Sequence, residues 1–216
     1  MDTPIKAIIL DLDGVITDTA EYHYRGWKRL ADEEGLPFDR EANEQLRGVS
    51  RRQSLLLILG DRKDEYTEEQ IQEMMARKNG YYQEMLDNLT AEDFLPGAKE
   101  LIAEIKARGL KIAIGSASKN TKRVLNSLRI IALFDAIGDG HSVERAKPAP
   151  DLFVHTAGKM GVPPRACVVI EDAESGVKAA LTGGFVAVGV GPEARVGKAH
   201  FRYDDTASID LDEVLS

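Results

Sequence analysis

The sequence predicts an α/β protein with a doubly wound, Rossmann-like parallel sheet, helices on both faces of that sheet, and a helical segment inserted after the first strand. Two observations lead to this prediction. Short apolar runs, typical of strands buried on both faces, alternate with amphipathic stretches of helical length along most of the chain. Between about residues 19 and 89 this alternation stops, and the pattern is helical without a convincing strand.

Four apolar runs have the length and composition of buried strands. They lie at residues 7–10, 111–114, 168–170 and 185–188. Amphipathic stretches lie between most of these runs. We predict helices from them at residues 98–108, 119–128, 151–160 and 175–181. The first of these helices begins after Pro96-Gly97 and ends at Gly109, which are ordinary start and stop signals.

The inserted segment has apolar residues of its own at helical spacing. These are Tyr22, Trp27 and Leu30, then Leu55 to Leu59, and then Ile71, Met74 and Met75. Core packing is the simplest explanation for most of them. We therefore predict a helical cap domain at residues 17–92 and a core domain made of residues 1–16 and 93–216, with linkers near residues 16–18 and 88–96.

Composition narrows the class of protein. The formal net charge of -8 over 216 residues argues against a general nucleic-acid partner, which would need a basic face, but it does not exclude a small anionic substrate. The single cysteine, Cys167, lies in an apolar run and is predicted to be a buried structural thiol. No signal peptide or long apolar stretch is recognisable, so we expect a cytoplasmic protein without membrane contact. We also expect a monomer.

Two aspartates follow the first predicted strand directly. Asp11 and Asp13 are separated by one residue and precede Gly14. Carboxylates in this position could hold Mg²⁺, which prefers hard oxygen ligands, or one of them could attack a phosphorus atom. Acidic residues also start ordinary turns after strands, and this pair alone does not decide between the three interpretations.

Two further residues suit the binding of phosphate. Ser116, after the second predicted strand, could hold phosphate oxygens together with the backbone amides that follow it, or it could simply cap the next helix. Lys147 precedes Pro148 in a stiff, extended segment, so its side chain could point inward at a phosphate, although most lysines are solvated.

A second acidic pair, Glu171-Asp172, follows the predicted strand at residues 168–170. Two acidic pairs would repel one another unless a cation neutralises them. In an open α/β sheet, ligands bind beyond the carboxyl ends of the strands, so all four groups could converge there. Packing does not explain such a set of two acidic pairs, a hydroxyl and a lysine.

With these residues in this order, the sequence resembles the haloacid dehalogenase superfamily over essentially the whole chain. The inserted helical segment matches the position of that family's cap, and the phosphomutases are the members that look most similar. The stretches that carry the resemblance are DLDGVITDTAEYH (residues 11–23), NEQLRGVSR (43–51), RKN (77–79), SASKN (116–120) and KPAPD (147–151).

The resemblance implies a role for each catalytic residue. Asp11 would be the nucleophile that becomes phosphorylated, and Asp13 the general acid and base. Mg²⁺ would be held by Asp11, the backbone carbonyl of Asp13, and Asp172, with Glu171 nearby or ligating through water. Ser116 and Lys147 would stabilise the transferring phosphoryl group.

The resemblance also implies a set of substrate-binding residues. Arg51 would clamp the phosphate that is not being transferred, where a solvated arginine is the alternative. His23 and Lys78 would form a pair that faces the site, where two helix-surface residues are the alternative. The complete expected set is His23, Trp27, Gly48, Val49, Ser50, Arg51, Lys78, Ala117, Ser118, Lys119 and Asn120.

The activity implied is the reversible conversion of β-glucose 1-phosphate into glucose 6-phosphate through β-glucose 1,6-bisphosphate. A sugar-phosphate phosphatase on the same fold is the nearest alternative. Arg47 and Gln53 differ from residues that are frequent in the family, in the segment that would select the sugar, so the choice of sugar stays open. A phosphorylated signalling receiver domain would need neither the insert nor the second acidic pair.

Overall fold

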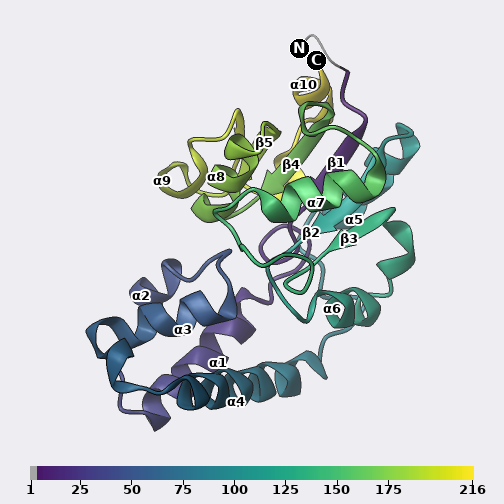
Figure 1. Cartoon of the computed structure of the whole chain (residues 1–216). Helices are drawn as coiled ribbons and strands as arrows, with labels where there is room; N and C mark the ends of the chain where they lie inside the picture. The colour runs from purple at the N-terminus through teal and green to yellow at the C-terminus, as the bar shows by residue number, and fades with distance from the viewer. Residues whose placement is uncertain (1–3) are drawn as a thin grey trace.

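Six parallel strands form a single sheet in the order β3-β2-β1-β4-β5-β6 (Figure 1). The computed structural model describes residues 4–216. The strands are β1 (Ala7–Leu10), β2 (Lys111–Gly115), β3 (Ala136–Gly138), β4 (Cys167–Glu171), β5 (Val186–Val190) and β6 (Phe201–Tyr203). The order reverses direction at β1, and ligands bind at such a point in open α/β sheets. The predicted fold class is confirmed.

The position of β1 inside the sheet explains why its sequence is apolar throughout. Ile8 and Leu10 pack into one hydrophobic cluster, and Ala7 and Ile9 into another. The first cluster includes residues of α5 (Ala98–Ala107), α6 (Thr121–Ser127) and α10 (Leu211–Leu215). The second includes residues of α7 (Asp151–Met160) and α8 (Glu174–Thr182). Both faces of the sheet are therefore covered, and neither face of β1 can tolerate a polar side chain.

The helices between residues 20 and 86, here called the helical insert, gather beyond one end of the sheet (Figure 1). They are α1 (Ala20–Glu33), α2 (Arg40–Glu44), α3 (Arg51–Leu59), the 3₁₀ helix η1 (Gly60–Glu65) and α4 (Glu68–Leu86). Ser50 caps α3, and Thr67 forms a capping box at the start of α4.

The helical insert has a hydrophobic cluster separate from those of the sheet. Trp27, Leu30, Leu55, Ile71 and Met74 belong to it, in agreement with the helical spacing of the sequence. Tyr22, predicted in the same stripe as Trp27, packs instead against the first cluster of the sheet. A segment with its own core could move as a unit, which is the basis of the predicted cap. The domain boundaries at residues 17 and 92 stay a prediction.

The two connections between the insert and the sheet lie side by side. The backbone amide of Leu95 donates to the carbonyl of Ile16 at 2.9 Å, and the Thr17 hydroxyl donates to the carbonyl of Asp93. The amide of Gly14 also donates to the carbonyl of Thr17, at 2.9 Å. The segment that leaves β1 is therefore folded back against the segment that returns from the insert.

Two edge strands, β3 and β6, are absent from the sequence prediction. Each has only three residues, and each lies at one edge of the sheet. Such short strands carry too few apolar residues to form a recognisable run. The remaining structure includes α9 (Glu193–Val196) and the 3₁₀ helices η2 (Ile131–Leu133), η3 (Pro164–Ala166) and η4 (Thr206–Ser208).

Cys167 is buried at the start of β4, as the sequence predicts. Burial raises the pKa of its thiol to about 11, so the reactive thiolate is scarce at neutral pH. Within residues 4–216, no helix is both long enough and apolar enough to cross a membrane.

Replacing Gly97 by Ala should destabilise the protein. Gly97 has a φ of +80°, and an added Cβ would lie 2.3 Å from the Cα of Ala207 in η4. We expect a loss of more than about 1 kcal/mol in the free energy of unfolding, measured by chemical denaturation.

Gly158→Ala in α7 is the matched control, because nothing lies within 4 Å of its added Cβ. This change should raise the free energy of unfolding by about 0.5–1 kcal/mol. Equal effects of the two substitutions would contradict the close approach at Gly97.

Candidate active site

A cavity of about 630 Å³ lies between the carboxyl ends of the strands and the helical insert. Its walls bring together most of the residues that the sequence analysis singles out. Those that line it are Asp11, Asp13, His23, Trp27, Gly48, Val49, Ser50, Arg51, Lys78, Ser116, Ala117, Ser118, Lys119 and Asp172. The other three predicted residues lie behind this wall: Lys147 and Glu171 contact Asp11 or one another, and Asn120 contacts the insert.

The strand-end wall of the cavity includes Asp11, Asp13, Ser116 and Asp172. Lys147 is the buried cation behind this wall. Its ammonium group lies 2.7 Å from Oδ1 of Asp11 and also contacts Oε1 of Glu171. The side chain of Lys147 is fully buried. Burial opposes its charge, but the two carboxylates outweigh burial and hold the pKa of Lys147 above its ordinary range. Lys147 therefore stays protonated beside Asp11 across the physiological pH range.

Three buried acidic residues offer oxygen ligands to a cation. One carboxylate oxygen each from Asp11, Glu171 and Asp172 can be chosen so that all lie within 4.8 Å of one another. Burial, and next the charge of Glu171, raises the pKa of Asp172 to about 7. Crowded carboxylates of this kind are costly without a positive charge between them, and an all-oxygen set suits a hard divalent cation such as Mg²⁺. The residues present therefore fit a metal of that class.

The two acidic loops approach each other closely because of Gly14. Its φ is +83°, and an added Cβ would lie 2.4 Å from Oδ2 of Asp172. Only glycine allows both the backbone conformation and the approach. Gly14 thus lets the loop after β1 and the loop after β4 share one site.

Asp13 has the properties of a proton-transfer group. Burial raises its pKa to about 7, although Lys147 and Lys78 oppose the shift. Within the described residues, its Oδ1 is buried and has no hydrogen-bond partner. A carboxyl group with a pKa near neutrality can both give and accept a proton at physiological pH.

The loop after β2 forms the next part of the wall. The hydroxyl of Ser116 accepts from the amide of Ser118 at 3.2 Å, and the hydroxyl of Ser118 accepts from the amide of Asn120 at 3.1 Å. Ser116 is buried, whereas Ala117 and Ser118 are partly exposed on the cavity side. These bonds hold the loop in one conformation just before α6 begins.

His23 and Lys78 meet on the insert side, 2.8 Å apart between Nδ1 and the ammonium nitrogen. The His23 ring also stacks on Tyr82, with 4.1 Å between centroids. Burial and the charge of Lys78 lower the pKa of His23 well below its ordinary value, so the ring is neutral. Burial and the charge of Arg51 lower the pKa of Lys78. Lys78 is buried and His23 is half-buried, and both line the cavity rather than a solvated helix surface.

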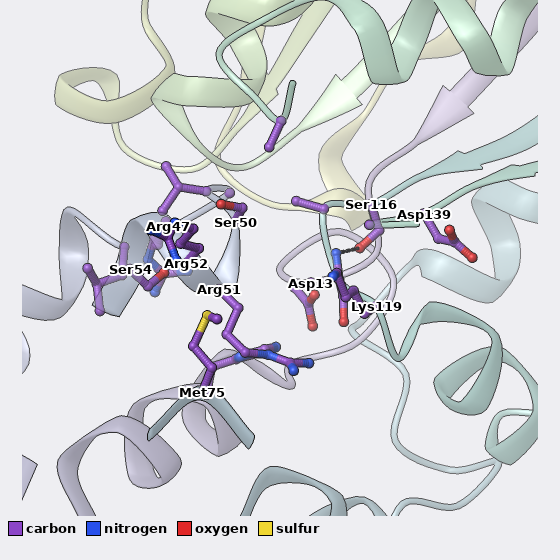
Figure 2. A pocket seen from close by; sticks show the side chains of 18 of the residues that line it. Asp13, Arg47, Ser50, Arg51, Arg52, Ser54, Met75, Ser116, Lys119 and Asp139 are labelled. Atoms are coloured by element: carbon purple, nitrogen blue, oxygen red, sulfur yellow. Dashed lines mark hydrogen bonds between the residues drawn. The ribbon is translucent and has the colours of Figure 1, made fainter. Parts of the chain in front are cut away.

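Arg51 reaches across the cavity toward Asp13 and Lys119 (Figure 2). Arg47, on the same side, contacts Oδ2 of Asp172 at 3.1 Å and thereby links the insert to the strand-end wall. Arg47 is predicted only to lie in the segment that would select the sugar, without a contact of its own. Asn79 lies behind Arg51 and is also unassigned, although both residues fall within the stretches that carry the family resemblance.

Asp139 and Gly140 line the cavity but are absent from the prediction. They follow β3, the short edge strand that the sequence pattern does not reveal. A residue at a strand end can be recognised only once its strand has been recognised. Arg195, 4.0 Å from Oδ2 of Asp172, is missed because no motif surrounds it.

The fold and the site define a class of phosphate-transferring proteins, and comparison with known families agrees. The chain belongs to the haloacid dehalogenase-like hydrolase family, whose model matches residues 5–184.

Three individual proteins show which members of the family this chain is similar to. The chain is 47% identical over 189 residues to the β-phosphoglucomutase of Bacillus subtilis, covering 87% of this chain and 84% of that protein. It matches the crystal structure of β-phosphoglucomutase from Clostridium difficile with a TM-score of 0.93 and 40% identity, over 97% of this chain and 95% of the other. It is also 26% identical to a phosphorylated carbohydrates phosphatase of Thermotoga maritima, over 98% of this chain and 97% of that protein.

Asp13→Asn should stabilise the metal-free protein, and the gain should depend on pH. Asp13 ionises near pH 3.8 in the unfolded chain and near 7 in the folded protein. Between these values the folded state keeps a proton that the unfolded state has lost, so wild-type stability falls as the pH rises. Asn has no such proton. The difference in the free energy of unfolding between the variant and the wild type should therefore grow from about pH 4 to about pH 7 and stay constant above that.

The measurement is the free energy of unfolding in urea at several pH values, with a chelator present to remove divalent cations. Parallel pH profiles for the wild type and the variant would contradict the raised pKa of Asp13.

Proposed function

We propose that the protein acts as a β-phosphoglucomutase, converting β-glucose 1-phosphate reversibly into glucose 6-phosphate with Asp11 as the carrier of the phosphoryl group. The observation that carries the proposal is the arrangement of the cavity. On the side of the strand ends, Asp11 lies beside protonated Lys147. On the side of the helical insert, called the insert wall, Arg51 lines the same cavity. A substrate with a phosphate at each end needs a site for each. The identity of 47% to a relative of that name supports the same activity.

Asp13 would move the proton in each half of the reaction. The phosphoryl group on Asp11 passes to the 6-hydroxyl of β-glucose 1-phosphate: the bond from phosphorus to Asp11 breaks, a bond to O6 forms, and Asp13 takes the hydroxyl proton. The bisphosphate then turns round. Its 1-phosphoryl group passes to Asp11, and Asp13 returns the proton to O1. A pKa of about 7 suits both directions.

Positioning and charge would supply most of the remaining catalysis, as in other phosphoryl transfers. Lys147 and Ser116 would hold oxygens of the phosphoryl group while it moves. Lys147 is already fixed beside Asp11 by two carboxylates, so little reorganisation is needed.

We also propose Mg²⁺ as the cofactor, held by Asp11, the backbone carbonyl of Asp13, and Asp172, with Glu171 nearby. The ion would screen the negative charge that builds up between the phosphoryl group and Asp11. The support is the cluster of buried acidic oxygens, which suits a hard divalent cation.

The helical insert would exclude water from phosphorylated Asp11. Asp11 is 5% exposed, and the insert covers its side of the cavity with His23, Lys78 and Arg51. A mutase must protect its aspartyl phosphate while the bisphosphate turns round, and a closing cap does this by excluding solvent.

A sugar-phosphate phosphatase is the second candidate. The relative from Thermotoga maritima, similar along almost its whole length, carries that name. A phosphatase would use the same Asp11 but would admit water to the phosphorylated aspartate. The two activities therefore differ in the product and not in the first chemical step.

Product analysis by phosphorus NMR tests the proposal. The protein would be incubated with Mg²⁺, β-glucose 1-phosphate and a trace of β-glucose 1,6-bisphosphate. We expect glucose 6-phosphate to accumulate without free phosphate. Free phosphate as the main product would overturn the mutase in favour of the phosphatase.

Asp13→Asn is the matched variant for this assay. Its turnover should fall by about 10²–10⁴-fold, the usual contribution of general acid–base catalysis. Mg²⁺ binding, measured by calorimetry, should stay within a few-fold of the wild type, because the proposed ligand at this position is the backbone carbonyl. Turnover close to that of the wild type would contradict the role of Asp13.

A further inference from the structure

Arg51 is held in the cavity by an uncharged acceptor. Its Nη2 donates to Oδ1 of Asn79 on α4 at 2.7 Å. The same oxygen accepts from Nδ2 of Asn120 at 2.9 Å, so that one amide joins the insert wall to the loop after β2. Two of the predicted substrate-binding residues, Arg51 and Asn120, thus converge on a side chain to which the family resemblance assigns no role.

The other arginines of the helical insert are neutralised by carboxylates. Each has an acidic oxygen within 4.0 Å: Arg25, Arg29, Arg40, Arg47, Arg52, Arg62 and Arg77. Arg52, the next residue along α3, forms a two-pronged ion pair with Glu68 at 2.7 and 2.8 Å. Across residues 4–216, no acidic group lies within that distance of Arg51.

The direction of each hydrogen bond follows from the chain of amides. Nε2 of Gln83 donates to Oδ1 of Asn120 at 3.1 Å, which directs the amide nitrogen of Asn120 toward Asn79. The Asn79 oxygen therefore faces two donors. Asn120 is 8% exposed, so water competes little for its amide, whereas Asn79 and Arg51 are half-buried.

An amide oxygen can fix a guanidinium without cancelling its charge. A carboxylate in the same place would hold Arg51 more strongly, but it would also compete with an incoming phosphate for the same donors. The charge of Arg51 acts on its neighbour Lys78: burial is the main cause of the lowered pKa of Lys78, and the charge of Arg51 is the second. Arg51 also lines the cavity, so its charge is available to an anion bound there.

We propose that Asn79 is a positioning residue: it holds Arg51 and Asn120 in register across the cavity through a neutral oxygen, so that the full charge of Arg51 binds the phosphate of the substrate that is not being transferred. This inference rests on the proposed function, because it assumes a sugar phosphate between the two walls. It adds a specific requirement, namely that residue 79 accept hydrogen bonds and carry no charge.

The test compares Asn79→Asp with Asn79→Ala in the Mg²⁺-loaded enzyme. Asp keeps the shape and the acceptor of Asn but adds a negative charge beside Arg51. We expect Asn79→Asp to weaken the binding of glucose 6-phosphate, measured by calorimetry, by about tenfold or more, and Asn79→Ala to weaken it less. In the mutase assay, Asn79→Asp should raise KM more than it lowers kcat, because the phosphate is held in both ground and transition states.

Asn88→Asp, at an exposed position just beyond α4, is the matched control for net charge and should leave binding unchanged. Circular dichroism melting of each variant separates misfolding from loss of binding. A packing role for Asn79 would give the opposite order, with the isosteric Asp tolerated better than Ala, and that order would overturn the inference.

Arg51→Ala separates this inference from the function on which it rests. If Arg51→Ala loses binding while Asn79→Asp binds normally, the inference about Asn79 is wrong and the proposed function stands. If the wild type does not bind glucose 6-phosphate, the proposed function fails and the inference fails with it.

Discussion

The buried contact between Lys147 and Asp11 joins segments that are 136 residues apart, and the rest of the site is arranged around it. Glu171 holds the same lysine from a third segment. Burying these charges is costly, and removing one partner of such a pair costs about 3–5 kcal/mol, although an apolar replacement of the whole set often costs nothing. Stability alone therefore does not account for the cluster, whereas the proposed transfer of a phosphoryl group at Asp11 would.

The parallel sheet makes this cluster possible. β1 and β4 are neighbours, so Asp11 and Glu171 meet at one end of the sheet, and Lys147 reaches them from the segment between β3 and α7. The helical insert begins at Ala20, shortly after Asp13, beside the same end of the sheet. It can therefore place His23, Arg51 and Lys78 over the acidic groups. In the proposed function, the chemistry would take place at the strand ends, and the substrate would be selected by helices joined to the sheet by two adjacent connections.

The central fold could be predicted because both faces of β1 are buried, which makes its sequence apolar throughout. The residues at its end were recognisable for the same reason. Asp139 was not, because β3 is too short to show a pattern. Asn79 was missed for a different reason: its partners Arg51 and Asn120 lie 28 and 41 residues away in the sequence, and no local pattern records such a contact.

The most direct test of the account is the detection of phosphate on Asp11. The Mg²⁺-loaded protein would be mixed with β-glucose 1,6-bisphosphate, quenched and reduced with borohydride, which converts an aspartyl phosphate into homoserine. We expect peptide mass spectrometry to find homoserine at position 11 in the wild type and not in Asp11→Asn. Phosphate found at another residue, or none on an enzyme that turns over the sugar phosphate, would contradict the central role of Asp11 and its contact with Lys147.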